Sequence, residues 1–540
     1  MHNYTKRPVD GLIIAHNYEN SSHSFQFSDD FFEQNVKSAR SSLFPDRENR
    51  IPFRFFPLTE EHIYPQACCR KDPAAQSDGR RSDLLRPLSP PQARSRTGGG
   101  VLASALRSPL IRSTLRVTLA SLLLRLLGLY VNSRITSLMG AEGMGLLQLG
   151  MNVEALAVTL GTSGIHFSVT RLVSEELGRG RPQAVRGILR SALFYALCFS
   201  CAAALLLILG AEAAAGMIGE ARLALSLRCF ALGIPFLALN SVLSGYFTAV
   251  YRPWKATLSQ GAEQLIMTAL ILVFLPLLPP GRPELGCAAV ALSGAGADLC
   301  SLLLSYLLYC FEVRGIRGDR SLRGGMRRLM SLSLPLAFSS YARTALSTLQ
   351  HLLVPRALRR SGETASAALS VYGTVSGMVF PVLTFASVFF NALSELLIPE
   401  LTRSQVRGDQ AGMDRTAGRI LSGCLLFSAA AALILFLLGP WLGRKLYRSA
   451  EAGMYLRLLS PLVVVMYLDS VVDGMLKGLG LHLSSMFINV LDAGLTLLGV
   501  TILLPRFGVR AYISLLYFSE CLNFTLSYLR LRRLVAIKLL

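Results

Sequence analysis

The chain has 540 residues, of which 52% are hydrophobic and only 16% are charged, and its formal net charge is +21. Soluble domains carry about 25% charged residues, so this composition excludes an ordinary soluble protein and favours a polytopic membrane protein. The positive charge does not indicate nucleic acid, because it gathers in short segments between long apolar stretches. We therefore expect a membrane protein with no nucleic-acid partner.

Residues 1–107 differ from the rest of the chain. They are polar and mixed in charge, and they contain no apolar stretch long enough to cross a bilayer. We expect either a disordered cytoplasmic tail or an extension added by a wrong start assignment. The second interpretation rests on the glycines at 98–100, whose purine-rich codons would stand before alternative starts at Val101 and Leu102.

Twelve apolar stretches follow, each about as long as the 20 helical residues that a bilayer core requires. They cover approximately 112–138, 147–171, 186–210, 223–250, 254–280, 284–311, 328–354, 366–392, 416–439, 454–477, 481–505 and 508–530. A polar segment from Glu312 to Arg328 divides them into six and six. The pattern predicts an all-α polytopic membrane protein of about 12 transmembrane helices, with six-helix bundles over 108–318 and 319–540.

The second six stretches repeat the first at a nearly fixed distance. The matching residues are Asn240 and Asp469, Arg228 and Arg457, and Glu263 and Asp492, each 229 positions apart, and Gly286 and Gly508, 222 positions apart. Repeated halves with polar residues recurring inside apolar stretches are typical of alternating-access transporters. We therefore expect the two bundles to be pseudo-symmetric.

Clusters of basic residues predict the orientation. They are Arg171 to Arg186, Arg252 and Lys255, Arg314 to Arg328, Arg403 to Arg415, and Arg530 to Lys538. These clusters all lie on one side of the membrane if both termini are cytoplasmic, which is the positive-inside pattern. Arg356, Arg359 and Arg360 are the exception. We expect a multi-pass protein of the cell membrane with its N and C termini in the cytoplasm.

The sequence contains no Walker A motif, zinc motif or nucleophile elbow, and its 10 cysteines show no metal or disulfide spacing. Without a phosphate-binding loop the chain cannot hydrolyse ATP, so any transport is passive or coupled to an ion. The pattern predicts a secondary transporter that is not an enzyme and has no cofactor and no metal site.

Several short motifs carry a resemblance. They are GAEGMGLLQL at 140–149, Thr170 to Glu176, Pro253-Trp254, Leu353 to Arg356, and Ile398-Pro399-Glu400-Leu401. Together, over about residues 108 to 535, they resemble the stage V sporulation protein B family. That family belongs to the polysaccharide-flippase branch of the multidrug/oligosaccharidyl-lipid/polysaccharide exporter superfamily.

The resemblance implies two six-helix bundles that form a V-shaped cavity. It implies a flippase that moves a lipid-linked oligosaccharide, a peptidoglycan or polysaccharide precursor, across the cytoplasmic membrane, with a link to the spore cortex. The implied partners are a polyprenyl-pyrophosphate-linked saccharide, membrane lipids and a cell-wall synthase.

A pyrophosphate-bearing substrate needs cations inside the membrane, and three arginines lie within predicted spans: Arg125 and Arg134 in the first and Arg343 in the seventh. An arginine near mid-bilayer costs about 3 kcal/mol or more and usually faces a wet cavity or a partner. Its planar fork fits phosphate oxygens. Arg125 also resembles the cavity-lining arginine of an Arg-x-x-Gly motif in lipid II flippases. We predict these three residues as substrate-binding cations; the alternatives are pairing with an acid and, for Arg134, snorkelling to the interface.

Acidic residues in the spans are candidates for ion coupling. Asp469 and Asp473 are four positions apart and so share one helix face, where two carboxylates share a proton or hold a cation. Glu263 and Asp492 recur through the repeat, which fits either ion coupling or a structural need. Alternatively, these acids pair with arginines or reach solvent near a helix end. The other acids in the spans are Glu154, Asp298, Glu395 and Glu520.

The sequence is compatible with three classes of function. The flippase leads, because Arg125 and Arg343 lie in opposite halves and suit an anionic lipid. The alternative is a proton- or sodium-coupled multidrug exporter of the same superfamily, whose cavity would favour acids and aromatic residues. A membrane scaffold or a membrane enzyme is the third class. An enzyme acting on polyprenyl phosphates would need an acidic metal site in a loop, which the sequence lacks.

Overall fold

The structure, a computed structural model, describes residues 109–533 except 163, 251, 280, 314–322, 386 and 388–409, and also residue 535. All the regular elements in this part of the chain are helical. The expectations for residues 1–107 and for Glu395 lie outside the described residues, and so does most of the junction between the two predicted bundles.

The first half of the molecule runs from residue 109 to 313. Its elements are α3 (Pro109–Thr162), α4 (Ile165–Gly178), α5 (Pro182–Ile218), α6 (Leu223–Ala231), α7 (Ile234–Ala249), α8 (Pro253–Phe274), the 3-10 turn η2 (Leu275–Leu277) and α9 (Pro283–Val313). Pro182 and Pro253 open α5 and α8, where a first-turn proline has no hydrogen bond to lose. Gly140 breaks α3 with a φ of 72°, a conformation that favours glycine, so α3 is two helices joined by a kink.

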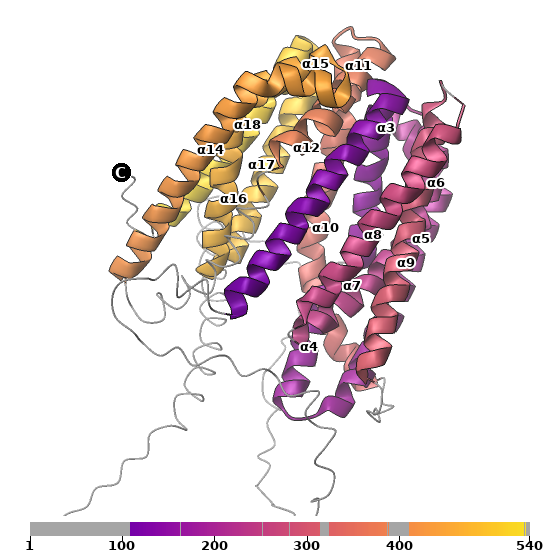
Figure 1. Cartoon of the computed structure of the whole chain (residues 1–540), viewed down its shortest axis with the longest axis vertical. Coiled ribbons are helices and arrows are strands. Elements are labelled where there is room, and N and C mark those ends of the chain that lie inside the picture. The colour runs from indigo at the N-terminus through magenta and orange to yellow at the C-terminus, as the bar shows by residue number, and fades with distance from the viewer. Residues whose placement is uncertain are drawn as a thin grey trace, which may run out of the picture. The chain divides into compact units, whose positions relative to one another are not determined.

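The second half runs from residue 323 to 533. Its elements are α10 (Arg323–Arg360), α11 (Ala365–Tyr372), the π-helix η3 (Gly373–Val379), α12 (Phe380–Leu383), α14 (Gln410–Tyr447), α15 (Ala450–Leu459), α16 (Leu462–Gly478), α17 (His482–Ile502) and α18 (Leu504–Arg532). Figure 1 shows α4 to α9 as one group of helices and α14 to α18 as another. The long helices α3 and α10 contact members of both groups.

The sequence repeat is also a repeat of helix packing. In the first half α5 packs on α6 and α7, while α7 and α8 pack on α9; in the second half α14 packs on α15 and α16, while α16 and α17 pack on α18. The turns match as well, because Gly219 after α5 and Arg448 after α14, 229 positions apart, both have positive φ, 79° and 52°. Elements at this spacing therefore adopt the same local structure.

The structure extends the repeat to helices that the sequence comparison did not match. Gly140, between the first and second predicted spans, and Gly362, between the seventh and eighth, are 222 positions apart and have φ values of 72° and 107°. The same spacing relates Gly286 near the start of α9 to Gly508 near the start of α18. The chain thus turns at equivalent glycines, Gly140 and Gly362, in the two halves.

Eight helices in the described residues are long and apolar enough to cross a membrane, or nine if the bent pair α15 and α16 forms one span. The first of them, Leu119–Gly178, contains most of the first predicted span and all of the second. Its 60 residues would extend roughly 90 Å as helix, about three times the thickness of a bilayer core. The prediction of an all-α, multi-pass membrane protein is confirmed, and the total of twelve spans stays a prediction.

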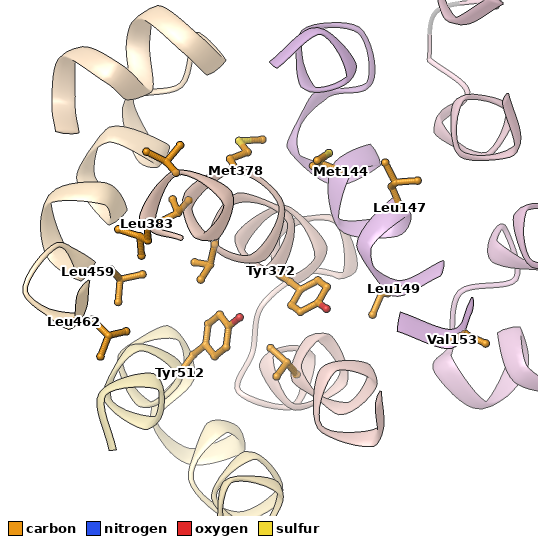
Figure 2. Packing of buried hydrophobic residues seen from close by; sticks show 14 of the residues in the cluster. Met144, Leu147, Leu149, Val153, Tyr372, Met378, Leu383, Leu459, Leu462 and Tyr512 are labelled. Atoms are coloured by element: carbon orange, nitrogen blue, oxygen red, sulfur yellow. The ribbon is translucent and has the colours of Figure 1, made fainter. Parts of the chain in front are cut away.

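The largest buried cluster joins the two halves (Figure 2). Met144, Leu147 and Leu149 of α3 pack toward Tyr372 of α11 and residues of η3, α12, α15, α16 and α18. Two glycines allow this close crossing: a Cβ on Gly145 would lie 2.2 Å from the Leu369 carbonyl oxygen, and one on Gly373 would lie 2.2 Å from that of Ala141. Backbone therefore packs directly on backbone where α3 meets α11 and η3.

Candidate functional site

Arg125 reaches from the first half to the second. Its side chain is partly buried on α3, and its Nη1 donates a hydrogen bond of 3.1 Å to Oγ of Ser387, which follows α12. Its charge also interacts with Tyr467 of α16. The Tyr467 hydroxyl in turn donates to the Leu383 carbonyl oxygen at 2.7 Å. This places a cation at the boundary between the halves, beside three polar groups of the second half.

Other polar residues of α3 hold this helix against the second half. The amide nitrogen of Asn132 donates to the Gly377 carbonyl oxygen at 2.5 Å, and the hydroxyl of Ser133 donates to the Leu446 carbonyl oxygen. Asn132 lies seven positions after Arg125 and therefore on the same face of the helix. These contacts fix the face of α3 that presents Arg125.

The other two predicted cations are placed differently. Arg134 and Arg343 are both exposed, and neither side chain forms an ion pair or hydrogen bond with the residues that the structure describes. On α10, Tyr341 donates to the Leu160 carbonyl oxygen at 3.1 Å, and Thr344 lies 3.5 Å from Thr159, so these residues attach α10 to α3. The structure thus brings Arg125 to the second half and leaves Arg134 and Arg343 without described partners.

Carboxylates of α16, α17 and α18 converge in the second half. Asp469 interacts electrostatically with Asp492 and Glu520, and its Oδ2 accepts a hydrogen bond of 3.4 Å from Asn523. The hydroxyl of Ser519 lies 2.9 Å from both carboxylate oxygens of Asp492. The buried Oδ1 of Asp469 has no hydrogen-bond partner among the described residues. Asp469 also interacts with Asp473, so three of the four predicted coupling residues, Asp469, Asp473 and Asp492, are brought together.

Asp473 lies on the same helix face but has partners of its own. Lys477, four positions later, forms an ion pair with it at 2.6 Å, and the Ser485 hydroxyl donates to it. Lys477 is in the last turn of α16 and is 42% exposed. This matches the alternative interpretation in which such an acid is neutralised near a helix end, although the cation is a lysine.

The fourth predicted coupling residue, Glu263, lies in the first half. On α8 it interacts with Ser301 and with Asp298 of α9, and Asp298 also interacts with Glu154 of α3. Gly233 makes room for this group, because a Cβ there would lie 2.8 Å from Oδ2 of Asp298. Glu263 and Asp492 therefore do not meet; each faces an acid of its own half.

The facing acids are equivalent through the repeat. Asp298 and Glu520 are 222 positions apart, so each half has an acid on its fifth span facing an acid on its sixth. Sequence reasoning noted both residues but did not match them. The 222-position spacing between Gly286 and Gly508 was the signal that would have found the pair.

The acids suit a proton or a monovalent cation. Within the described ranges no three His, Cys, Asp or Glu side chains are placed to hold a metal ion. Neighbouring carboxylates disfavour each other's charged form, so such a group takes up a proton or a cation readily. The hydroxyl of Ser519 and the amide of Asn523 provide neutral contacts around Asp492 and Asp469.

Comparisons with known proteins identify the family. The model of the polysaccharide biosynthesis protein family matches residues 110–405, more than half of the chain. Stage V sporulation protein B of Bacillus subtilis (strain 168) is 26% identical over 395 residues, which cover 71% of this chain and 75% of that protein. The uncharacterized membrane protein YabM of the same organism is 24% identical over 406 residues, covering 73% and 74%.

Solved structures share the fold. An inward-facing multidrug resistance MATE family transporter of the MOP superfamily superposes with a TM-score of 0.59 at 15% identity, covering 76% of this chain and 98% of that one. A MOP superfamily transporter from Pyrococcus furiosus with reversed polarity of its binding pocket gives 0.55 at 15% identity, covering 81% and 98%. The chain therefore belongs to the polysaccharide biosynthesis protein family, and it shares the fold of the MATE family transporter.

Proposed function

We propose that this protein is a secondary transporter, a flippase that moves a lipid-linked oligosaccharide, a precursor of peptidoglycan or of another polysaccharide, across the cytoplasmic membrane. The family supports a polysaccharide precursor as cargo, and the similarity to stage V sporulation protein B supports a role in spore formation, with a cell-wall synthase as partner. The observation that carries the proposal is the guanidinium of Arg125 at the boundary between the halves. Its planar fork can exchange the Ser387 hydroxyl for the oxygens of a pyrophosphate.

The proposed architecture has twelve spans in two pseudo-symmetric bundles, 108–318 and 319–540, around a V-shaped cavity. The repeated helix packing supports it. The end of the bundle that carries Arg179, Lys255 and Arg328 is taken as cytoplasmic, which puts both termini in the cytoplasm. Gly140 and Gly362 then lie toward the outer face, with Arg134 near the outer interface.

We infer that transport is coupled to a proton or sodium gradient through Asp469, Asp492 and Glu520. The unpartnered Oδ1 of Asp469 supports this role, because a buried carboxylate oxygen needs a proton, a cation or a donor. Glu263 is the equivalent candidate in the first half. Asp473 is the weaker candidate, because Lys477 already neutralises it.

The test is accumulation of lipid-linked precursor in cells depleted of this protein and complemented with variants. Wild type restores a normal precursor level, and Arg125→Ala does not, although it inserts into the membrane. Arg343→Ala is expected to fail too if its exposed side chain faces the cavity. Arg134→Ala, which like Arg125→Ala removes one positive charge from α3, is expected to restore a normal precursor level, since we propose that Arg134 lies at the membrane interface.

The alternative function is a cation-coupled multidrug exporter. The observation that favours it is the convergence of Asp469, Asp492 and Glu520, which also suits an organic cation. Depletion of the protein from cells distinguishes the two functions. If the precursor level is unchanged and the cells become sensitive to cationic dyes, the protein is an exporter rather than a flippase. If the precursor accumulates and the resistance of the cells to cationic dyes is unchanged, the exporter function is excluded.

A further inference from the structure

A groove lies beside α17 and α18, where α10 ends. Its volume is about 1040 Å³, and all of its lining residues come from these two helices, the short connection between them and the turn after α10. The apolar part of the lining includes Leu495, Leu503, Phe507 and Phe518. These side chains are between 37% and 63% exposed, so they form an open apolar slot rather than a closed core.

The internal repeat explains why this groove exists in the second half. In the first half the long side chain of Met139 packs on Gly286, where a Cβ would lie 2.9 Å from the methionine sulfur. The equivalent residues, 222 positions later, are Ser361 and Gly508, and a Cβ on Gly508 would lie 3.1 Å from the serine hydroxyl. The side chain of serine has two heavy atoms fewer than that of methionine, so it leaves open the space that Met139 fills in the first half.

The charges differ between the halves in the same place. Arg506 and Arg510 line the groove, whereas the residues 222 positions earlier are Glu284 and Ala288. Both arginines are exposed, and neither side chain has an ion pair or hydrogen bond with the described residues. Glu363 also lines the groove. The lining therefore carries a net charge of +1, close to the apolar slot.

The length of the groove fits one leaflet of a bilayer. From Val509 to Phe518, α18 rises roughly 14 Å, at 1.5 Å per residue. Half of a bilayer core is about 15 Å. Arg506 and Arg510 lie near the start of α18, at one end of the groove, and Phe518 lies further along the helix. In the orientation proposed above, the arginines would lie nearest the lipid headgroups and Phe518 toward the middle of the membrane.

We propose that this groove binds an anionic glycerophospholipid, with its phosphodiester on Arg506 and Arg510 and an acyl chain along the apolar slot. Arginine pairs with phosphate oxygens through two parallel hydrogen bonds. A headgroup with a single phosphodiester and no amine carries one negative charge, which balances the net charge of +1 on the lining. The first half contributes no lining residue, so the groove is separate from the Arg125 site at the boundary between the halves.

The test is retention of phosphatidylglycerol by the full-length protein extracted from vesicles of phosphatidylglycerol and phosphatidylcholine, counted by native mass spectrometry. The double variant Arg506→Ala/Arg510→Ala is expected to bind phosphatidylglycerol about tenfold more weakly or worse. The matched control, Arg444→Ala/Lys445→Ala, removes two cations at the same end of the molecule outside the groove and is expected to retain the lipid.

A second variant tests the groove without changing its charge. Ser361→Met gives the second half the residue that fills this place in the first half, and it is expected to reduce retention. Equal loss of lipid from the Arg444/Lys445 control would overturn the proposal, as would full retention by Ser361→Met. Displacement of the lipid by a polyprenyl phosphate would also overturn it, because the groove would then belong to the transported cargo.

Discussion

Where α7 of the first half carries Asn240, α16 of the second half carries Asp469. Asn240 donates to the Ser301 hydroxyl at 3.0 Å and accepts from Ser305 at 2.7 Å, so its amide is satisfied without charge. Asp469 receives one hydrogen bond, from Asn523, the residue equivalent to Ser301. One half has a neutral network, and the other has a carboxylate with one oxygen that no described residue contacts by a hydrogen bond.

Two facing pairs of acids are present, one in each half. Glu263 faces Asp298 in the first half, and Asp492 faces Glu520 in the second. An acidic pair present in both halves meets a requirement of the shared fold or of a motion that both halves perform. An acid present in one half alone indicates a specialised task. We therefore propose Asp469, rather than the recurring pairs, as the leading coupling residue. Asp473 and Glu154 also lack an acidic equivalent, but Asp473 is paired with Lys477 and Glu154 faces Asp298.

The largest effect is expected from exchanging the residues at the equivalent positions Asn240 and Asp469. Asp469→Asn gives the second half the first half's residue and keeps a partner for Asn523. Gradient-driven transport in proteoliposomes is expected to fall about tenfold or more, which corresponds to roughly 1.4 kcal/mol of lost coupling energy. The folded yield is expected to stay unchanged, because an amide costs less to bury than a carboxylate.

The control for this exchange removes a carboxylate elsewhere in the second half. Glu451→Gln, in the exposed first turn of α15, is expected to transport like the wild type. The reverse exchange, Asn240→Asp, adds a charge near Glu263 and Asp298 and is expected to lower the thermal midpoint of unfolding. Full gradient-driven transport by Asp469→Asn would show that the difference between the halves is unrelated to coupling.

The crossing between the halves offers the next largest effect. Gly145 and Gly373 permit backbone contact there, whereas the residues related to them by 222 positions are Ala367 and Met151. Gly373→Ala is expected to destabilise the protein by about 1–3 kcal/mol, because its Cβ would overlap backbone that cannot rotate away. The measurement is the thermal midpoint in one detergent.

A glycine in open space controls for the change in helix propensity. Gly423 of α14 has no atom within 4 Å of a Cβ placed on it. Gly423→Ala is therefore expected to be neutral or stabilising by up to about 1 kcal/mol. If Gly373→Ala unfolds at the same temperature as Gly423→Ala, the close crossing of the two halves is not what holds α3 to η3.

Local signals in the sequence predicted much of the fold. The apolar stretches within the described residues and the repeat at 229 positions are properties of short segments, and the structure reproduces them as helices and as repeated helix packing. The predicted fourth and tenth spans are each broken into two helices, at Gly233 and Pro461, which the single apolar stretches did not indicate. Breaks of this kind depend on packing against neighbouring helices as well as on the glycine or proline itself.

The site was less predictable because its contacts are distant in sequence. Arg125 was predicted from its position in an apolar span, but its partner Ser387 is 262 residues away. Lys477, the partner of Asp473, is four residues away and could have been predicted from helix geometry. The groove depends on the difference between Met139 and Ser361, which becomes visible only when the structure matches the first and seventh spans.

The smallest expected effect concerns the turns after α5 and α14. Gly219 adopts its φ of 79° freely, whereas Arg448 adopts a φ of 52° against the crowding of its own Cβ. Arg448→Gly is expected to stabilise the protein by about 0.5–1 kcal/mol, and Gly219→Ala to destabilise it by a similar amount. Arg448→Ala removes the same charge but keeps a Cβ, so it separates strain from charge. If Arg448→Ala raises the thermal midpoint as much as Arg448→Gly does, the two turns differ in electrostatics and not in backbone strain.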